Sequence, residues 1–249
     1  MFIIGTAGSG KSRLTSSFSN WLKLKKQEVI SVNLDPGALS LPYQPDVDVR
    51  EYISLNGLME NYSLGPNGAL IMAADLIATE VDTIRTEIED YNADYVIIDT
   101  PGQMELFAFR VSGPYIVNEL TTDPKALLYL FDSTFSINPL NYVSNLFLAS
   151  AVHTRFTIPM LHVLSKTDLV PEDKLEAILD WGEKPTSLED AIEETLTGTS
   201  RLMSRELMHL IANLDFLFSL IPVSATSETG FINLHATVMR IFTGGEEII

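Results

Sequence analysis

The segment GTAGSGKS, at residues 5–12, constrains this chain more than any other stretch. It follows the apolar run FII at 2–4 and precedes a predicted helix at 12–26. The pattern G-x-x-x-x-G-K-[ST] is typical of a loop between a strand and a helix whose backbone N–H groups point inward around phosphate oxygens. The helix N-terminus adds a dipole that favours an anion. The sequence therefore predicts a strand, a phosphate-binding loop (the P-loop) and a helix.

Further apolar, β-branched runs recur along the chain, and each is followed by a helical pattern. Continuous apolar strands that alternate with helices indicate a parallel sheet covered on both faces. We expect an α/β fold of the P-loop NTPase type, with a mostly parallel central sheet, helices on both faces and helical insertions. The expected strands are 2–4, 28–34, 94–100, 125–133, 159–166 and 218–225.

The chain of 249 residues shows no internal repeat and no low-complexity linker, so we expect one domain over 1–249. Two helix-rich regions interrupt the alternation, at about 54–92 and about 172–216. Ligands of open α/β sheets bind at the carboxyl ends of the strands. Several polar motifs directly follow an expected strand, so we expect them to form one site.

Composition excludes several classes of function. The net charge is −17 and no Lys/Arg run exceeds Lys25–Lys26, so we expect no direct nucleic-acid binding. The longest apolar runs are too short to cross a bilayer, and no basic leader precedes the first strand, so we expect a cytoplasmic protein without a membrane contact. The chain has no cysteine, which excludes disulfides and thiolate metal sites.

In a P-loop, the lysine reaches the β- and γ-phosphates and the following hydroxyl ligates Mg²⁺. These roles fall on Lys11 and Ser12. The loop alone does not separate a kinase from an ATPase or a GTPase. The residues expected to bind the nucleotide here are Gly8, Ser9, Gly10, Lys11, Ser12 and Arg13.

The run DYVIIDTPGQ ends a strand with Asp99, where P-loop proteins commonly hold the Mg²⁺ shell. Gly102 can offer its backbone N–H to a γ-phosphate, which makes the following segment sensitive to hydrolysis. Gln103 is a candidate for positioning water, with a structural role as the alternative. Asp35 follows the second strand in SVNLDPGA and is a candidate Mg²⁺ ligand or orienting group for the attacking water, although the segment could also be only a turn.

The segment SKTD, at 165–168, follows another expected strand. The Asp168 carboxylate can accept two hydrogen bonds from guanine, whereas adenine lacks the exocyclic amine and would leave the carboxylate unpaired. Lys166 can lay its aliphatic stem along the purine. The common GTPase form is Asn-Lys-x-Asp, so the serine here is a departure. After the last strand, Ser224 and Ala225 can offer a backbone N–H to guanine O6.

The segment SLGPNGAL, at 63–70, could be an ordinary turn between two helices. In combination with the other motifs, however, the chain resembles the GPN-loop GTPases, of the archaeal type, over nearly its whole length. Serine at the start of the base motif occurs in that family. The motifs that carry the resemblance are, in chain order, GTAGSGKS, NLDPG, LPYQPDVDVRE, GPNGA, DTPGQME, SKTD and VSA.

The resemblance implies a dimer in which each subunit inserts its Gly-Pro-Asn loop into the partner's active site. Asn67 would then act in trans near the γ-phosphate, and Asp35 would orient the water, supported by Gln103 and Lys11. Pro66 would stiffen the turn, and an amide can donate to phosphate oxygens with less charge stabilisation than an arginine gives. Arg50 would organise the loop or serve a structural role.

The function expected from the resemblance is hydrolysis of GTP to GDP and phosphate by a homodimer with Mg²⁺ held by Ser12, Asp35 and Asp99. A nucleotide-dependent change of shape would serve protein assembly, with clients such as RNA polymerase assembly factors. One alternative is a GTP-dependent scaffold or chaperone in which turnover hardly matters. Another is a small-molecule kinase, against which the scarcity of arginine and the guanine-selecting motifs argue.

Overall fold

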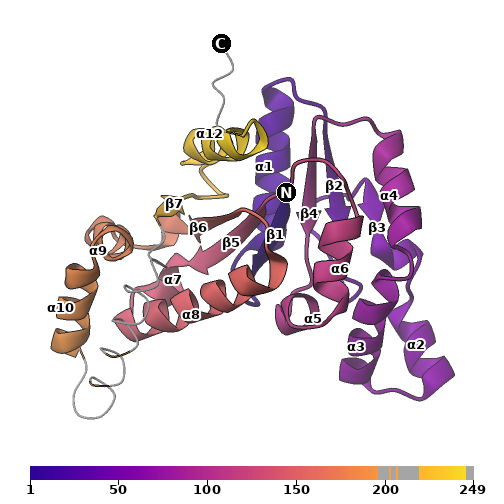
Figure 1. Ribbon diagram of the computed structural model, residues 1–249, viewed down its shortest axis with the longest axis horizontal. Helices are drawn as coiled ribbons and strands as arrows, with labels where there is room; N and C mark the ends of the chain where they lie inside the picture. Colours follow the sequence, from indigo (N-terminus) through magenta and orange to yellow (C-terminus); the bar gives the residue numbers. More distant parts are fainter. Residues whose placement is uncertain (196–201, 203–205, 207–218, 245–249) are drawn as a thin grey trace.

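A computed structural model describes residues 1–195, 202, 206 and 219–244. Its centre is a sheet of seven strands, all parallel, in the order β3-β2-β4-β1-β5-β6-β7 (Figure 1). The expected α/β fold with a parallel sheet is therefore confirmed. The strands are β1 (Phe2–Gly5), β2 (Val29–Asn33), β3 (Val47–Asp48), β4 (Tyr95–Asp99), β5 (Leu127–Asp132), β6 (Met160–Ser165) and β7 (Leu220–Pro222).

All six expected strands are present, and β3 is an additional one that the sequence did not predict. It has two residues and pairs with β2 through Val32 with Val47 and Asn33 with Asp48. Such a short strand carries no apolar run of its own. Asp46 fixes it from outside the ladder, because its carboxylate accepts hydrogen bonds from the backbone N–H and the hydroxyl of Ser31, at 2.7 and 3.0 Å.

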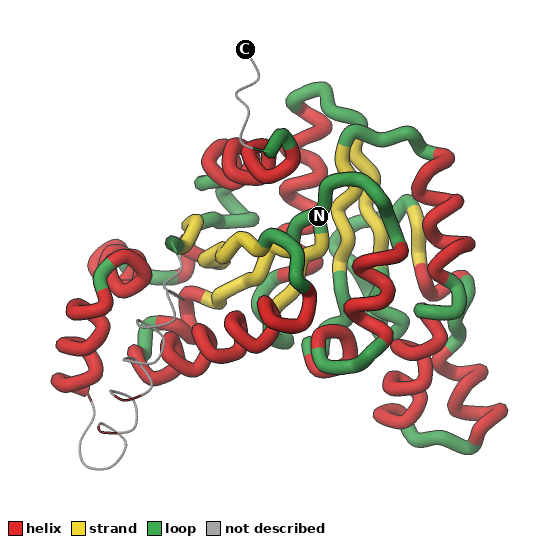
Figure 2. The backbone as a smooth tube through the Cα atoms, viewed as in Figure 1, coloured by secondary structure: helices red, strands yellow, loops and turns green. Residues whose placement is uncertain are grey.

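Alternate side chains of the strands enter two separate hydrophobic cores. Ile3 packs with α1 (Lys11–Leu24) and α12 (Phe231–Phe242) on one face of the sheet. Phe2 and Ile4 pack on the opposite face. The helices there are α2 (Leu55–Tyr62), α3 (Pro66–Ile77), α4 (Val81–Asp90), α5 (Glu105–Ala108), α6 (Ser112–Glu119), α8 (Pro139–Phe156), α9 (Glu172–Glu183) and α10 (Pro185–Thr195), as Figure 2 shows.

The region predicted to be helical at about 54–92 consists of α2, α3 and α4. In the second region, 172–216, α9 and α10 confirm the helical prediction up to residue 195, and the rest lies mainly outside the described residues. Shorter helical segments are α7 (Ser133–Ser136), η1 (Val49–Glu51) and η2 (Thr167–Leu169). Within the described ranges, no helix has both the length and the apolar character needed to cross a membrane.

Because every strand is parallel, all strands end at the same edge of the sheet. The P-loop follows β1, the LDPG segment follows β2, and the DTPGQ segment follows β4. SKTD follows β6 and VSA follows β7 at the same edge. The sequence motifs thus converge, as their positions after the strands predicted.

Candidate nucleotide site

The P-loop has the backbone geometry that its glycines permit. Gly8 and Gly10 have φ angles of 78° and 98°, in the left-handed region that residues with a Cβ rarely adopt. Gly10 directly precedes α1, whose N-terminus faces the loop. Ser9 is fully buried, and its hydroxyl makes no hydrogen bond to any residue that the structure describes.

Lys11 folds back over the loop and is only 6% exposed. Its ammonium donates to the carbonyl oxygens of Gly5, Thr6 and Gly102, at 3.0, 3.1 and 3.2 Å. Burial lowers the pKa of Lys11, while the nearby carboxylates, with Asp99 first, oppose this shift. The lysine therefore uses backbone carbonyls as partners where a nucleotide would supply phosphate oxygens.

Asp35 joins two loops of the site. One carboxylate oxygen accepts the backbone N–H of Gly37 at 2.8 Å, and the other accepts that of Gly102 at 2.8 Å. The N–H of Gly102 that the sequence assigned to a γ-phosphate is thus donated to Asp35 in this structure. A phosphate could take this N–H only if it displaced the carboxylate.

Asp99, the last residue of β4, is buried at 1% exposure. One of its oxygens accepts the hydroxyl of Tyr43 at 3.0 Å, and the other has no hydrogen-bond partner among the described residues. Burial raises the pKa of Asp99 to about 6, although the hydroxyls of Ser12 and Tyr43 and the charge of Lys11 act against it.

A buried carboxylate oxygen without a partner, next to the Ser12 hydroxyl, fits a hard cation such as Mg²⁺. No group of three or more His, Asp or Glu side chains within the described ranges could hold a metal ion. Phosphate and water oxygens would therefore have to complete the coordination shell. Asp35 is already engaged by two N–H groups, so Asp99 and Ser12 fit the ion better than Asp35 does.

The base end of the site is tied to the P-loop by Ser165. Its buried hydroxyl donates to the carbonyl of Ser9 at 2.8 Å and lies 3.1 Å from that of Phe131. Ser165 stands where the common motif has asparagine, and its hydroxyl connects the SKTD segment to the P-loop. Lys166 has a φ of 60°, and its ammonium forms an ion pair with Asp132 at 2.7 Å.

A cavity of about 340 Å³ opens beside Gly10 and is lined by the stem of Lys166 and by Asp168. Asp168 is exposed, and its side chain makes no hydrogen bond to a described residue. Ala225 and Thr226 line the same cavity. Arg13 also lines this cavity.

The structure separates the two residues proposed for the guanine carbonyl. The backbone N–H of Ser224 donates to the carbonyl of Thr229 at 3.0 Å, and its hydroxyl accepts from the N–H groups of Thr226 and Ser227 at 3.2 and 3.1 Å. Ser224 is therefore a structural residue of the turn. Ala225 lines the cavity, so the N–H of Ala225 is the better candidate donor.

Near the phosphate end, a second cavity of about 220 Å³ lies between Asp35, Gly102 and α3. Gln103 lines it with an exposed side chain, which leaves the amide able to reach water there. Asn67 stands at the start of α3, is exposed, and makes no hydrogen bond to a residue that the structure describes. Asn67 does not line this cavity.

Comparisons with known proteins agree with this geometry. A family model described as "Conserved hypothetical ATP binding protein" matches residues 3–244. GPN-loop GTPase 3 of Mycosarcoma maydis is 30% identical over 241 residues, which cover 92% of this chain and 85% of that protein. The chain belongs to the GPN-loop GTPase family.

Two other comparisons define the extent of the likeness. GPN-loop GTPase 1 of Saccharomyces cerevisiae is 32% identical over 237 residues, or 91% of this chain and 61% of that protein. The chain spans 53–61% of the length of three such relatives. The crystal structure of a GTPase in apo form from Pyrococcus abyssi superposes with a TM-score of 0.84 at 29% identity, covering 97% of this chain and 96% of that one.

Two residues of this GPN-loop protein carry contacts that motif reasoning did not assign. Tyr43, within the quoted LPYQPDVDVRE, binds Asp99. Asp132 holds Lys166, and burial, which would raise the pKa of Asp132, is outweighed by hydrogen bonds from Lys166 and Thr134 that lower it. Asp132 is the last residue of β5, whereas Tyr43 lies in the loop between β2 and β3.

Arg50 has the structural role that was one of its two expected roles. It donates to both carboxylate oxygens of Asp48, with the shortest contact at 2.5 Å, and to the carbonyl of Ala38 at 2.8 Å. Asn33 also donates to Asp48, at 2.9 Å. This network fixes the segment that carries Asp35 and Tyr43 and does not reach the GPN loop.

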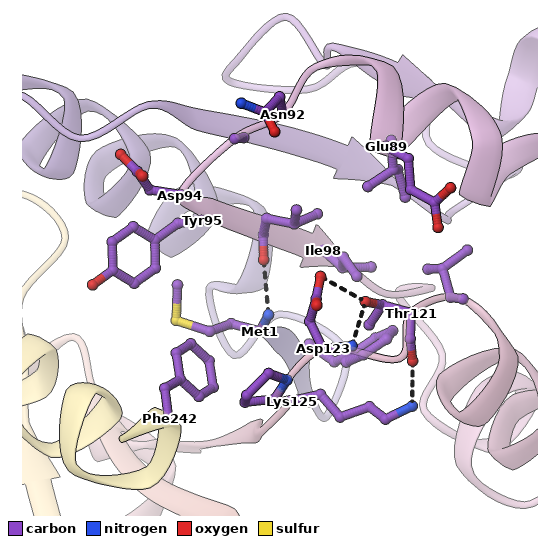
Figure 3. A pocket seen from close by; sticks show the side chains of 16 residues that line it. Met1, Glu89, Asn92, Asp94, Tyr95, Ile98, Thr121, Asp123, Lys125 and Phe242 are labelled. Carbon is purple, nitrogen blue, oxygen red and sulfur yellow. Dashed lines mark hydrogen bonds between the residues drawn. The ribbon is translucent and has the colours of Figure 1, made fainter. Parts of the chain in front are cut away.

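A larger cavity, of about 630 Å³, lies at the opposite edge of the sheet (Figure 3). Tyr95 and Asp94, at the start of β4, line it together with Lys125, which precedes β5. The ammonium of Lys125 already donates to the carbonyls of Val117, Asn118 and Thr121. This cavity contains none of the nucleotide motifs, so its size does not make it the functional site.

Proposed function

We propose that this chain hydrolyses GTP to GDP and phosphate, with Mg²⁺, as a homodimer. The observation that carries the proposal is the cavity beside Gly10, where an unpaired carboxylate, Asp168, lies directly next to a P-loop. Guanine can donate two hydrogen bonds to that carboxylate and accept one from the Ala225 N–H. Adenine can satisfy neither group, because its edge has the opposite donor and acceptor pattern. The description of the matching family names ATP, but this chemistry favours GTP.

Hydrolysis would proceed by in-line attack of water on the γ-phosphate. Lys11 would transfer its hydrogen bonds from the carbonyls of the loop to phosphate oxygens. Gly102 would release Asp35 and donate its N–H to the γ-phosphate, which frees the carboxylate to orient the water. Mg²⁺, held by Ser12 and, directly or through water, by Asp99, would stabilise the charge on the phosphates.

Asn67 would supply an amide to the active site of the partner subunit. The support is that Asn67 is exposed, has no hydrogen-bond partner among described residues and does not line the phosphate cavity of its own subunit. An amide there could donate to the phosphate or hold the attacking water. Loss of the γ-phosphate would return Gly102 to Asp35 and change the shape of the dimer, and we propose that this change serves the assembly of client proteins.

The first test measures phosphate release from GTP and ATP by the wild type and by Asn67→Ala, with the mass of each determined by light scattering. We expect a wild-type dimer that hydrolyses GTP only, and at least a tenfold lower rate for the variant without loss of the dimer. Normal turnover by Asn67→Ala would refute catalysis by the GPN loop. Tight GTP binding with negligible turnover in the wild type would instead support a GTP-dependent scaffold.

A further inference from the structure

The position of Asn67 depends on α3 as a whole. The side chain of Asn67 is exposed and unpaired within the described part, and Gly65 and Pro66 before it are exposed as well. The N-terminus of α3 has no side-chain cap. Nothing local therefore holds Asn67, and whatever fixes α3 decides where its amide points.

The middle of α3 lies beside the phosphate loops of its own subunit. Leu70 and Ala74 line the 220 Å³ cavity together with Asp35 and Gly102. Leu70 also packs closely on Gly37, since a Cβ added at Gly37 would lie 2.7 Å from a methyl of Leu70. The face of α3 that carries Leu70 and Ala74 thus lines the same cavity as Asp35 and Gly102, which exchange partners under the proposed function.

The second half of α3 is joined to the segment that follows DTPGQ. Asp75 accepts a hydrogen bond from the Arg110 Nε at 2.8 Å and a second one from the same guanidinium. The hydroxyl of Ser112 lies 3.1 Å from Asp75 as a further donor. The hydrogen bonds from Arg110 hold the pKa of Asp75 below its usual value, so the carboxylate is charged at neutral pH. Because the guanidinium of Arg110 and the carboxylate of Asp75 share two hydrogen bonds, both the distance between the two groups and their relative orientation are restricted.

We propose that Asp75 and Arg110 are positioning residues for Asn67. They couple α3 to residues 101–112 of the same subunit, so that the nucleotide in one subunit controls how its Asn67 serves the partner. This inference rests on the proposed function, in which Asn67 acts in trans. Binding of a γ-phosphate would move Gly102 away from Asp35, residues 101–112 would follow, and Arg110 would carry α3 with them.

The ion pair between Arg110 and Asp75 matters for the position of α3 rather than for the stability of the fold. The side chains of Arg110 and Asp75 are 34% and 46% exposed, and exposed ion pairs contribute little to folding. Substitution of Arg110 should therefore leave the fold intact. A matched control is Arg85, whose guanidinium pairs with Asp82 on α4 and donates to the carbonyl of Glu119, away from α3.

Mixed dimers provide the test. One subunit, the acceptor, carries Asn67→Ala and keeps a complete active site; the other, the donor, carries Asp35→Asn, which removes the carboxylate proposed to orient the water and leaves Ser12, Asp99 and its GPN loop in place. Each homodimer is expected to be nearly inactive, whereas the mixed dimer has one competent site and recovers about half of the wild-type rate. Arg110→Gln is then placed in the donor or in the acceptor, and kcat and KM for GTP are measured.

We expect Arg110→Gln in the donor to lower kcat of the mixed dimer at least threefold with KM unchanged, because the affected Asn67 serves the partner's site. The same change in the acceptor has a smaller effect, Arg85→Gln in the donor has none, and Arg110→Lys restores part of the rate. Equal losses from Arg110→Gln in either subunit, or a donor effect no larger than that of Arg85→Gln, would overturn the inference alone. Absence of any recovery in the mixed dimer would refute action in trans and the inference with it.

Discussion

The two ends of the nucleotide site differ in how their polar groups are satisfied. At the base end, Ser165 and Lys166 are held by fixed partners, Ser9 and Asp132, while Asp168, the proposed guanine-binding group, makes no hydrogen bond to a described residue. At the phosphate end, Lys11 and Asp35 are both engaged with the peptide groups of Gly102. Under the proposed function, the base end would bind without giving up contacts, whereas the phosphate end would have to give up the contacts with Gly102.

This difference assigns nucleotide affinity to the base end and the response to the γ-phosphate to the phosphate end. A preformed cavity loses little conformational entropy on binding, so the base end can supply affinity and selectivity in every nucleotide state. Contacts that a phosphate replaces are sensitive to whether the phosphate is present. GDP and GTP share the base, and they differ only at the end of the site that exchanges partners.

The largest effect is expected from Asp99→Asn at the phosphate end. Replacing the buried carboxylate weakens the Mg²⁺ site, and we expect GTP turnover to fall at least about 100-fold. The measurement is phosphate release over a range of Mg²⁺ concentrations. A variant that recovers the wild-type rate at ordinary Mg²⁺ would show that Asp99 is not part of the metal site.

The same variant should be more stable than the wild type when nucleotide and metal are removed. Burial raises the pKa of Asp99 to about 6, above its value near 3.9 in an unfolded chain. The folded protein then binds more protons than the unfolded one between these pH values, so the stabilising effect of protonation is present below pH 4 and is lost as the pH rises through 6. The excess in Tm of Asp99→Asn over the wild type should therefore grow from pH 4 to 7, and an excess that is constant with pH would contradict this.

A smaller but selective effect is expected from Asp168→Asn at the base end. The amide can no longer accept both guanine N–H groups, so GTP and GDP affinity should each fall about 100-fold while ATP affinity stays low. Competition against a fluorescent guanine nucleotide measures all three. If the affinity for GTP fell and the affinity for GDP did not, the base end would also respond to the γ-phosphate. The division between the two ends would then be wrong.

The convergence of the motifs that follow the strands was predictable, because a parallel sheet must bring the carboxyl ends of all its strands to one edge. Asp35, Asp99 and Lys11 were brought together at this edge as expected, and Asp168 lines a cavity there, which we propose binds guanine. Their partners were not predictable, since contacts such as Tyr43 with Asp99 or Arg110 with Asp75 join residues far apart in sequence and follow no fixed spacing. The two-residue strand β3 was missed for a similar reason, because pairing with β2 rather than its own composition defines it.

The smallest effect is expected from Ser165→Ala, which removes the connection between the base loop and the P-loop. The Ser9 carbonyl loses a buried hydrogen bond worth about 1 kcal/mol, so GTP and GDP affinity should both fall about threefold to tenfold with their ratio unchanged. Ser136→Ala is a matched control, because the Ser136 hydroxyl is equally buried but has no hydrogen-bond partner among the described residues. Equal losses in the two variants would mean that burial of the hydroxyl matters and the connection does not. A change confined to GTP would place Ser165 with the phosphate end, because only the γ-phosphate distinguishes the two nucleotides.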